Sequence, residues 1–396
     1  MTRTPLAVLD LVPISSGSTA AQALRNSMDL ARQAESLGYA RYWFAEHHLN
    51  PGLAGTSPAV VLALTAAATS TIRLGSGAVQ MGHRTALSVV EEFGLLDVAY
   101  PGRFDLGLGR SAGGPSAPKA PTPADDAGSG GADSGGAGSG GAGSGGISAV
   151  VDGRTANGLL IPPPFSTAEL RKSPRFKLQK HLLQLPGAHS QDYTEQVGDV
   201  LALIAGTYRA ADGEEAHVVP GEGAALQVWI LGSSGGESAE VAGQRGLRFA
   251  ANYHVSPATV IEAVEGYRAA FKDTGELSRP YVSVSADVVV ADSAARAREL
   301  AAGYGPWVRS IRTAEGAIQF PTPEEARRYP WTDADRALVA DRVDTQFTGT
   351  PAEVADQLER LRDATEADEL IITTITHDHA DRVRSYRLLA QEWARR

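Results

Sequence analysis

Apolar residues in the first hundred positions alternate between short continuous runs and helical spacing. Leu6 to Leu11 is an apolar run with the length of a buried strand, and Ala20 to Leu37 has helical spacing that ends before Gly38. The alternation then continues, with strands expected at 41–45, 72–79 and 104–108 and helices at 58–69 and 86–99. This order is typical of strand–helix–strand units in a parallel sheet.

The same alternation resumes after residue 192 and runs to the end of the chain. We expect strands at 227–231, 247–251, 281–290 and 369–374, and helices at 193–208, 237–245, 257–271, 293–304, 322–343, 351–362 and 380–394. The eight strands, each followed by helical residues, predict an α/β fold of the TIM (β/α)8 barrel class. Periodicity alone leaves a doubly wound open sheet as the alternative.

Residues 112–192 interrupt the alternation between the fourth strand and its helix. The stretch 124–146 is almost entirely Gly, Ala, Ser and Asp, which cannot bury a core, and we expect it to be disordered. A basic run begins at Arg171, and one helix is expected from Arg175 to Leu185. We interpret 112–192 as an insertion in one barrel domain spanning 1–396. Its basic run would form a lid, a docking surface or a solvated polar segment.

The overall composition is that of a globular, acidic protein without cysteine. Of the 396 residues, 43% are hydrophobic and 21% are charged, and the formal net charge is -10. The acidic balance argues against a nucleic-acid partner, and the lack of cysteine excludes disulfides and Cys-ligated metals. No stretch approaches the roughly 20 apolar residues needed to cross a membrane. We therefore expect a soluble cytoplasmic protein with no membrane partner.

Candidate chemistry follows the strands, because barrel active sites form at the carboxyl ends of their strands. The small residues of the loop 232–238 lie between a strand and a helix and present backbone N–H groups that suit a phosphate, with an ordinary tight turn as the alternative. Arg110, at another strand end, offers a forked charge to the same phosphate or else forms a surface ion pair. The histidines at 47–48 and 377–379 form no H-E-x-x-H motif, and we expect no metal.

Five sequence segments form a set whose order and spacing are specific, although each segment is weak alone. They are WFAEHH at 43–48, the run at 72–82, GRFDLGLGRS at 102–111, LGSSGGES at 231–238 and FTGTP at 347–351. The set resembles the luciferase-like flavin-dependent monooxygenases, the bacterial luciferase family, and most of all the subgroup found in aromatic polyketide pathways. The resemblance stops at 112–192, which is far longer than the usual connection in that family.

The resemblance implies a barrel that holds FMN at its mouth, with site residues assigned by motif position. His47 matches the catalytic histidine, Glu46 beside it is a second catalytic candidate, and Glu91 is a third that matches a carboxylate in a helix beside the site. Gly77–Ala78 matches the place of a non-proline cis peptide beneath the flavin ring. Arg110 matches an arginine that contacts the phosphate. The residues that match the phosphate loop are Ser233, Ser234, Gly235 and Ser238.

The implied activity is oxygenation of a small organic substrate by reduced FMN and O2 through a C4a-peroxyflavin, with His47 as general acid or base. No second nucleotide-binding motif is present, so we expect a separate NAD(P)H:flavin reductase to supply reduced FMN, and we expect a homodimer. The alternatives are an F420-dependent hydride-transfer enzyme on the same barrel and a non-catalytic flavin-binding protein. An aldolase or isomerase barrel is disfavoured because no lysine follows a predicted strand.

Overall fold

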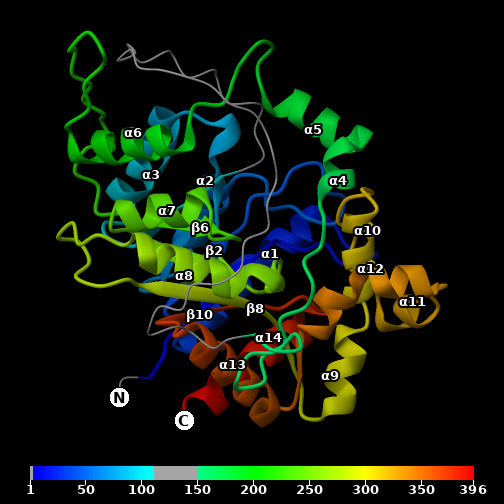
Figure 1. Cartoon of the computed structure of the whole chain (residues 1–396). Helices are drawn as coiled ribbons and strands as arrows, with labels where there is room; N and C mark the ends of the chain where they lie inside the picture. Colours follow the sequence, from blue (N-terminus) through cyan, green and yellow to red (C-terminus); the bar gives the residue numbers. More distant parts are fainter. Residues whose placement is uncertain (1–2, 111–149) are drawn as a thin grey trace, which may run out of the picture.

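The computed structural model describes residues 3–110 and 150–396 and contains a closed parallel barrel of eight strands (Figure 1). The strands are β1 (Leu6–Asp10), β2 (Arg41–Phe44), β3 (Arg73–Ser76), β5 (Phe104–Gly109), β6 (Gln227–Gly232), β7 (Arg248–Asn252), β8 (Val282–Val290) and β10 (Glu369–Thr373). They pair in that order, and β10 pairs with both β8 and β1 to close the ring. The predicted TIM barrel is confirmed, and the open-sheet alternative is wrong.

The third barrel strand is shorter than the run 72–79 predicted. It is interrupted at Gly77–Ala78, whose peptide bond is cis. The chain then forms the short strand β4 (Val79–Gln80), which pairs with β5, and a 3-10 turn at Met81–His83. A further short strand, β9 (Phe347–Gly349), pairs with the end of β8.

Helices surround the barrel (Figure 1). They are α1 (Ala20–Ser36), α2 (Pro58–Ala66), α3 (Ala86–Ala99), α6 (Tyr193–Ala205), α7 (Glu237–Gln244), α8 (Val260–Ala270), α13 (Pro351–Thr365) and α14 (His379–Trp393). Side-chain caps fix where several of them begin, as at Thr19 before α1 and in the capping box of Thr350 before α13. Their buried faces pack on the strands, where Leu30 and Leu358 are fully buried. In the described part of the chain, no helix is long and apolar enough to span a membrane.

The segment between β8 and β9 folds into more helices than the sequence predicted. They are α9 (Ala294–Ala301), α10 (Tyr304–Arg312), α11 (Pro323–Arg327) and α12 (Asp333–Asp344). The helix predicted at 293–304 corresponds to α9, and the sequence did not predict α10 as a separate helix. The predicted helix 322–343 is divided near Pro330, and α12 begins again at the capping box of Thr332. Missing α10 matters, because α10 and α12 both contribute residues to the cavity at the barrel mouth.

Residues 150–192, the described part of the predicted insertion, form two short helices. They are α4 (Ala168–Lys172) and α5 (Pro174–Leu183), and the hydroxyl of Ser173 caps α5 by accepting the backbone N–H of Phe176. The helix expected at 175–185 is confirmed by α5, whereas α4 was not expected. The tract 124–146, expected to be disordered, lies outside the described residues.

Side chains alternate along each strand between the barrel interior and the surrounding helices. At the amino ends of the strands the interior holds a buried charge network. Arg41 Nη1 lies 2.7 Å from Asp105 Oδ2, and Arg41 Nε lies 2.8 Å from Glu369 Oε1. Arg73 forms a second ion pair with Asp105 at 2.7 Å. Each of these charges has a partner of opposite sign, as burial requires.

An aromatic pair lies next to the charge network, one step toward the carboxyl ends of the strands. Trp43 and Trp229 are fully buried and meet edge to face, with ring centroids 5.0 Å apart. The indole N–H of Trp43 donates to Asp105 at 2.9 Å, which joins the aromatic layer to the charged one. Together the two layers fill the interior at the amino ends of the strands in the described part of the chain.

Asp105→Ala should lower the free energy of unfolding by about 3–5 kcal/mol, because it removes the buried carboxylate that pairs with Arg41 and Arg73. Arg41 keeps Glu369, whereas Arg73 loses its carboxylate partner. Urea unfolding followed by circular dichroism measures the loss. Asp292→Ala is the matched control, since Asp292 pairs with Arg384 at an exposed position and should cost less than about 1 kcal/mol. Equal losses in the two variants would contradict a structural role for the buried network.

Candidate active site

A cavity of about 640 Å³ opens above the tryptophan pair at the carboxyl ends of the strands. This volume lies within the range of roughly 300–1,000 Å³ that is usual for small-molecule sites. Residues that follow β2, β3, β5, β6 and β7 line the cavity, together with residues of α4, α5, α10 and α12. It therefore occupies the position of the active site in TIM barrel enzymes.

Most of the predicted site residues line this cavity, although they come from different strand ends. His47 follows β2, and Gly77–Ala78 follows β3 with the cis peptide bond that the resemblance implied. Arg110 follows β5. The loop between β6 and α7 contributes Ser233, Ser234 and Ser238.

Three predicted site residues do not line the cavity. Glu91 is exposed on α3, because the helical register turns its neighbour Val90 toward the core and Glu91 away from it. Glu91 therefore lies outside the cavity where a catalytic carboxylate was expected. The backbone N–H of Gly235 donates to Glu262 Oε1 at 3.1 Å, so this N–H is already bonded within the protein. Glu46 is buried behind the cavity wall.

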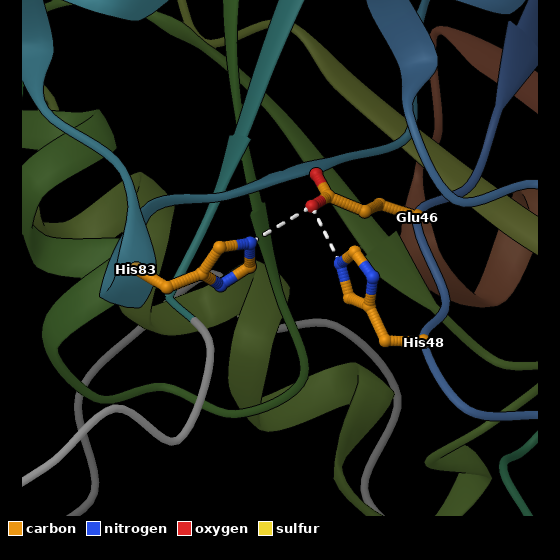
Figure 2. A group of neighbouring side chains, drawn as sticks. All are labelled: Glu46, His48 and His83. Atoms are coloured by element: carbon orange, nitrogen blue, oxygen red, sulfur yellow. Dashed lines mark hydrogen bonds and ion pairs between the residues drawn. The ribbon is translucent and has the colours of Figure 1, made fainter. Parts of the chain in front are cut away.

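Glu46 is a buried hydrogen-bond acceptor that joins the end of β2 to the segment after β4 (Figure 2). The Nε2 atoms of His48 and His83 lie 2.8 and 3.1 Å from Glu46 Oε1, and the backbone N–H of Gln80 donates to Oε2 at 3.0 Å. Burial alone would raise the pKa of Glu46, but these hydrogen bonds and the charge of Arg84 lower it to about 2. The ionised carboxylate positions both chain segments beside the cavity.

The donor atoms of Glu46, His48 and His83 lie within 4.8 Å of one another, which is close enough for a metal-ligand set. However, Arg84 Nε lies 3.6 Å from the same carboxylate oxygen that both imidazoles already contact. A metal ion placed there would meet the positive charge of Arg84. The contacts therefore favour a hydrogen-bonded anchor. The histidines at 377–379 contact separate parts of the chain and do not converge.

His47 is held neutral at physiological pH. Burial and, less strongly, the charge of His48 lower its pKa to about 4. Its backbone N–H donates to Gly55 O at 2.8 Å, whereas ring Nδ1 is buried with no hydrogen-bond partner among the described residues. A neutral imidazole in a cavity can accept a proton from a bound molecule and return it.

Another part of the cavity lining holds a polar group that the sequence analysis did not identify. Asp287 on β8 accepts a hydrogen bond from the Tyr304 hydroxyl, and its Oδ2 lies 3.3 Å from Arg342 Nη2. His254 Nδ1 contacts Ser285 Oγ at 2.6 Å, and burial and then the charge of Arg342 lower the pKa of His254 to about 3. A lone carboxylate within the apolar run 282–290 was a readable signal for Asp287. No comparable sequence signal identified Tyr304 on α10 or Arg342 on α12 as members of this polar group.

The cavity fits a flavin mononucleotide in the chemistry of its donors and acceptors. Helix α7 begins without a side-chain cap, so its first backbone N–H groups are open to an anion such as phosphate. Arg110 Nη1 lies 2.6 Å from Glu237 Oε2, so Arg110 must share or leave this ion pair to reach a phosphate. Asn252 Oδ1 and Thr373 Oγ1, in two further lining residues, have no partner among the described residues. A flavin ring offers both N–H and carbonyl groups, which can pair with these two oxygen atoms.

Helices α4 and α5 place the basic run of the insertion at the cavity. The α4–α5 segment contributes Thr167, Leu170, Arg171, Ser173, Arg175 and Phe176 to the cavity lining. Arg175 Nη2 donates to Leu49 O at 2.5 Å and to Asn50 Oδ1 at 3.0 Å, which fixes α5 to the loop after β2. This position supports the lid interpretation of the basic run.

The chain belongs to the luciferase-like monooxygenase family, whose model matches residues 4–127 and 196–367. A luciferase-like monooxygenase of Escherichia coli (strain K12) is 31% identical over 383 residues, covering 96% of this chain and 94% of the relative. The N-acetyl-S-alkylcysteine monooxygenase of Bacillus subtilis (strain 168) is 47% identical over 109 residues, covering 28% of this chain and 33% of the relative.

Two solved structures share the fold over nearly the whole chain. Apo-MsnO8 superposes with a TM-score of 0.73 at 28% identity, covering 99% of this chain and 98% of that one. The oxygenating constituent of 3,6-diketocamphane monooxygenase from Pseudomonas putida, solved with FMN, has a TM-score of 0.62 at 18% identity, with 99% and 98% coverage. The chain is therefore a monooxygenase of this family.

Stability should fall as pH falls from about 6.5, by about 1.4 kcal/mol per pH unit for each of His47 and His254. The folded protein holds both imidazoles neutral, with pKa values of about 4 and 3, whereas the unfolded chain binds protons below its ordinary value of 6.5. The pKa of Glu46 is lowered to about 2, so this carboxylate adds to the loss of stability only below about pH 4.5, its ordinary pKa. Urea unfolding between pH 7 and pH 5 measures the slope.

The double variant His47→Asn/His254→Asn should flatten that slope, while His217→Asn, at an exposed position, should not. If the double variant loses stability with the same slope as the wild type, the two buried imidazoles are not the groups that titrate.

Proposed function

We propose that the protein is an FMN-dependent monooxygenase that uses reduced FMN and O2 to oxygenate a small, largely apolar organic substrate. The observation that carries the proposal is that neutral His47, the Gly77–Ala78 peptide and the uncapped start of α7 meet in one cavity. When bound, reduced FMN supplies the oxygen activation. The chain binds and orients the reactants, excludes water and moves protons.

We assign phosphate binding to the start of α7. The hydroxyls of Ser233, Ser234 and Ser238 surround the uncapped helix end, where the helix dipole favours negative charge. Arg110 would exchange part of its contact with Glu237 for the phosphate and form a charge-assisted hydrogen bond. Gly235 is left out of this site, because its N–H is taken by another carboxylate.

We assign proton transfer to His47. Burial disfavours its charged form, so a proton taken up from the reacting molecules is readily returned. Glu46 is a positioning residue, since its hydrogen bonds fix the chain on both sides of the cavity wall without touching the cavity. Glu91 has no part in this proposal, because it is exposed on α3.

We further propose that 112–192 is an insertion within a single domain of 1–396 and that its α4–α5 segment limits the access of water to the cavity. The contacts of Arg175 with the loop after β2 support a closed position of this lid. A separate NAD(P)H:flavin reductase would supply the reduced FMN. A homodimer is supported by exposed apolar side chains on α2 and α3, namely Val60, Leu64, Leu87, Leu95 and Val98.

Cofactor titration tests the proposal against the F420-dependent alternative. Binding of oxidised FMN and of F420 to the purified protein is measured by fluorescence, and oxygen uptake is then measured after the bound cofactor is reduced. The proposal expects FMN to bind more tightly than F420 and oxygen uptake to lead to an oxygenated product. Preference for F420 with no oxygenation would favour hydride transfer, and release of hydrogen peroxide alone would favour a non-catalytic flavin-binding protein.

His47→Ala should keep the FMN dissociation constant within about twofold but lower turnover by about 10²–10⁴-fold, because it removes the general acid–base group. Oxygen-dependent conversion of N-acetyl-S-benzylcysteine, followed by mass spectrometry of the products, is a suitable first assay, since one relative acts on N-acetyl-S-alkylcysteines by name. The control is His217→Ala, which alters an exposed histidine. Undiminished turnover in His47→Ala would remove His47 from the proposed chemistry.

Arg110→Ala should weaken FMN binding by about tenfold or more and leave the binding of riboflavin, which lacks the phosphate, nearly unaffected. Fluorescence titration of both ligands measures the difference. Arg171→Ala, which removes another arginine that lines the cavity, serves as the control and should leave the FMN-to-riboflavin ratio unchanged. A similar loss for both ligands in Arg110→Ala would show that Arg110 does not bind the phosphate.

A further inference from the structure

The buried guanidinium of Arg342 is not used by the proposed flavin site. Arg342 is 7% exposed, lines the cavity from α12 and is the ion-pair partner of Asp287. Its Nε and Nη2 donate to the Tyr304 hydroxyl at 3.0 and 2.7 Å. The hydrogen bonds of Arg342 to described residues are made by Nε and Nη2, which leaves Nη1 available to a ligand in the cavity, since a guanidinium group can donate five hydrogen bonds.

A second donor in the same part of the cavity lining is buried and unpaired. The ring of Trp307 stacks on that of Tyr304 with centroids 6.0 Å apart, and Trp307 lines the cavity. Its indole N–H is buried with no hydrogen-bond partner in the described part of the chain. Arginine and tryptophan side chains donate but do not accept, so the ligand group that satisfies them must be an acceptor. Leaving a buried donor unpaired costs about 1–3 kcal/mol.

The surroundings of these donors are largely apolar. Ile371 and Ile375, at the end of β10, and Ile311 on α10 line the same cavity. Arg342 comes from the segment after β8, whereas the proposed phosphate site follows β6, with β7 between them in the barrel order. A ligand group at Arg342 would therefore lie at a separate part of the cavity lining from the phosphate.

Resting on the proposed function, we propose that the organic substrate is an apolar carboxylic acid whose carboxylate is bound by Arg342, with Trp307 as a second donor. The planar guanidinium suits a carboxylate in geometry as well as in charge. Asp287 already shares Arg342, and burial raises the pKa of Asp287, so this carboxyl can take up a proton when a second carboxylate arrives. The apolar wall binds the remainder of the acid.

Isothermal titration calorimetry with an acid and its matched amide tests this assignment. The probes are N-acetyl-S-benzylcysteine and its primary amide, each titrated into the protein with and without bound FMN. The wild type should bind the acid about tenfold or more tightly than the amide, because only the acid brings a negative charge that forms an ion pair with the guanidinium of Arg342. Absence of this difference in the wild type would overturn the proposal.

Variants of the ion pair should change acid binding in opposite directions. Arg342→Gln should remove the preference for the acid, and Asp287→Asn should increase it, since it removes the competing carboxylate. Trp307→Phe should weaken binding of the acid by a few fold. Arg171→Gln, which alters a lid arginine, should leave the preference for the acid over the amide unchanged. Circular dichroism and thermal unfolding confirm that each variant is folded.

The FMN titration separates failure of this inference from failure of the proposed function. If Arg342→Gln keeps the acid preference, or lowers FMN affinity instead, Arg342 does not bind the substrate carboxylate, whereas FMN binding by the wild type would still support the monooxygenase. If the wild type binds no FMN but prefers the acid, the carboxylate site stands and the proposed cofactor does not.

Discussion

Closure of the barrel is the constraint on which the rest of the structure depends. Eight short strands turn half of their side chains inward, and the interior must be filled or left as a cavity. At the amino ends it is filled by paired charges around Arg41 and Asp105, followed by Trp43 and Trp229. At the carboxyl ends the lining includes Gly77 and Gly109, where an added Cβ atom would lie only 2.8 Å from Leu9 Cδ1 and 3.0 Å from Ala78 Cβ. The cavity is therefore a direct result of which residues occupy successive layers.

Burial in this cavity sets the charge state of its residues. The same desolvation that keeps His47 and His254 neutral is overcome at Glu46 by hydrogen bonds and at Arg342 by a carboxylate and a hydroxyl. The site thus combines neutral imidazoles, which can exchange protons, with fixed charges, which can orient ligands. The fixed charges are paired within the protein, so a ligand must compete with Glu237 for Arg110 and with Asp287 for Arg342.

The sequence predicted the barrel and much of the site because both depend on local order along the chain. Strand–helix alternation indicated all eight barrel strands, and residues that directly follow strands, such as His47 and Arg110, were brought to the mouth by topology alone. Glu91 was expected beside the site but is exposed, because packing decides which face of α3 turns inward. Arg342 was missed because a helix break at Pro330 and the crossing of α10 and α12 over the mouth depend on tertiary contacts.

The central claim is that one cavity holds the flavin between His47 and the start of α7. A crystal structure of the protein with FMN tests it most directly. The account predicts the phosphate at Ser233, Ser234, Ser238 and Arg110, the ring against Gly77–Ala78, and the wall at Arg342 left open. A phosphate bound at Arg342 or at the arginines of α4 and α5, with the ring away from His47, would contradict it.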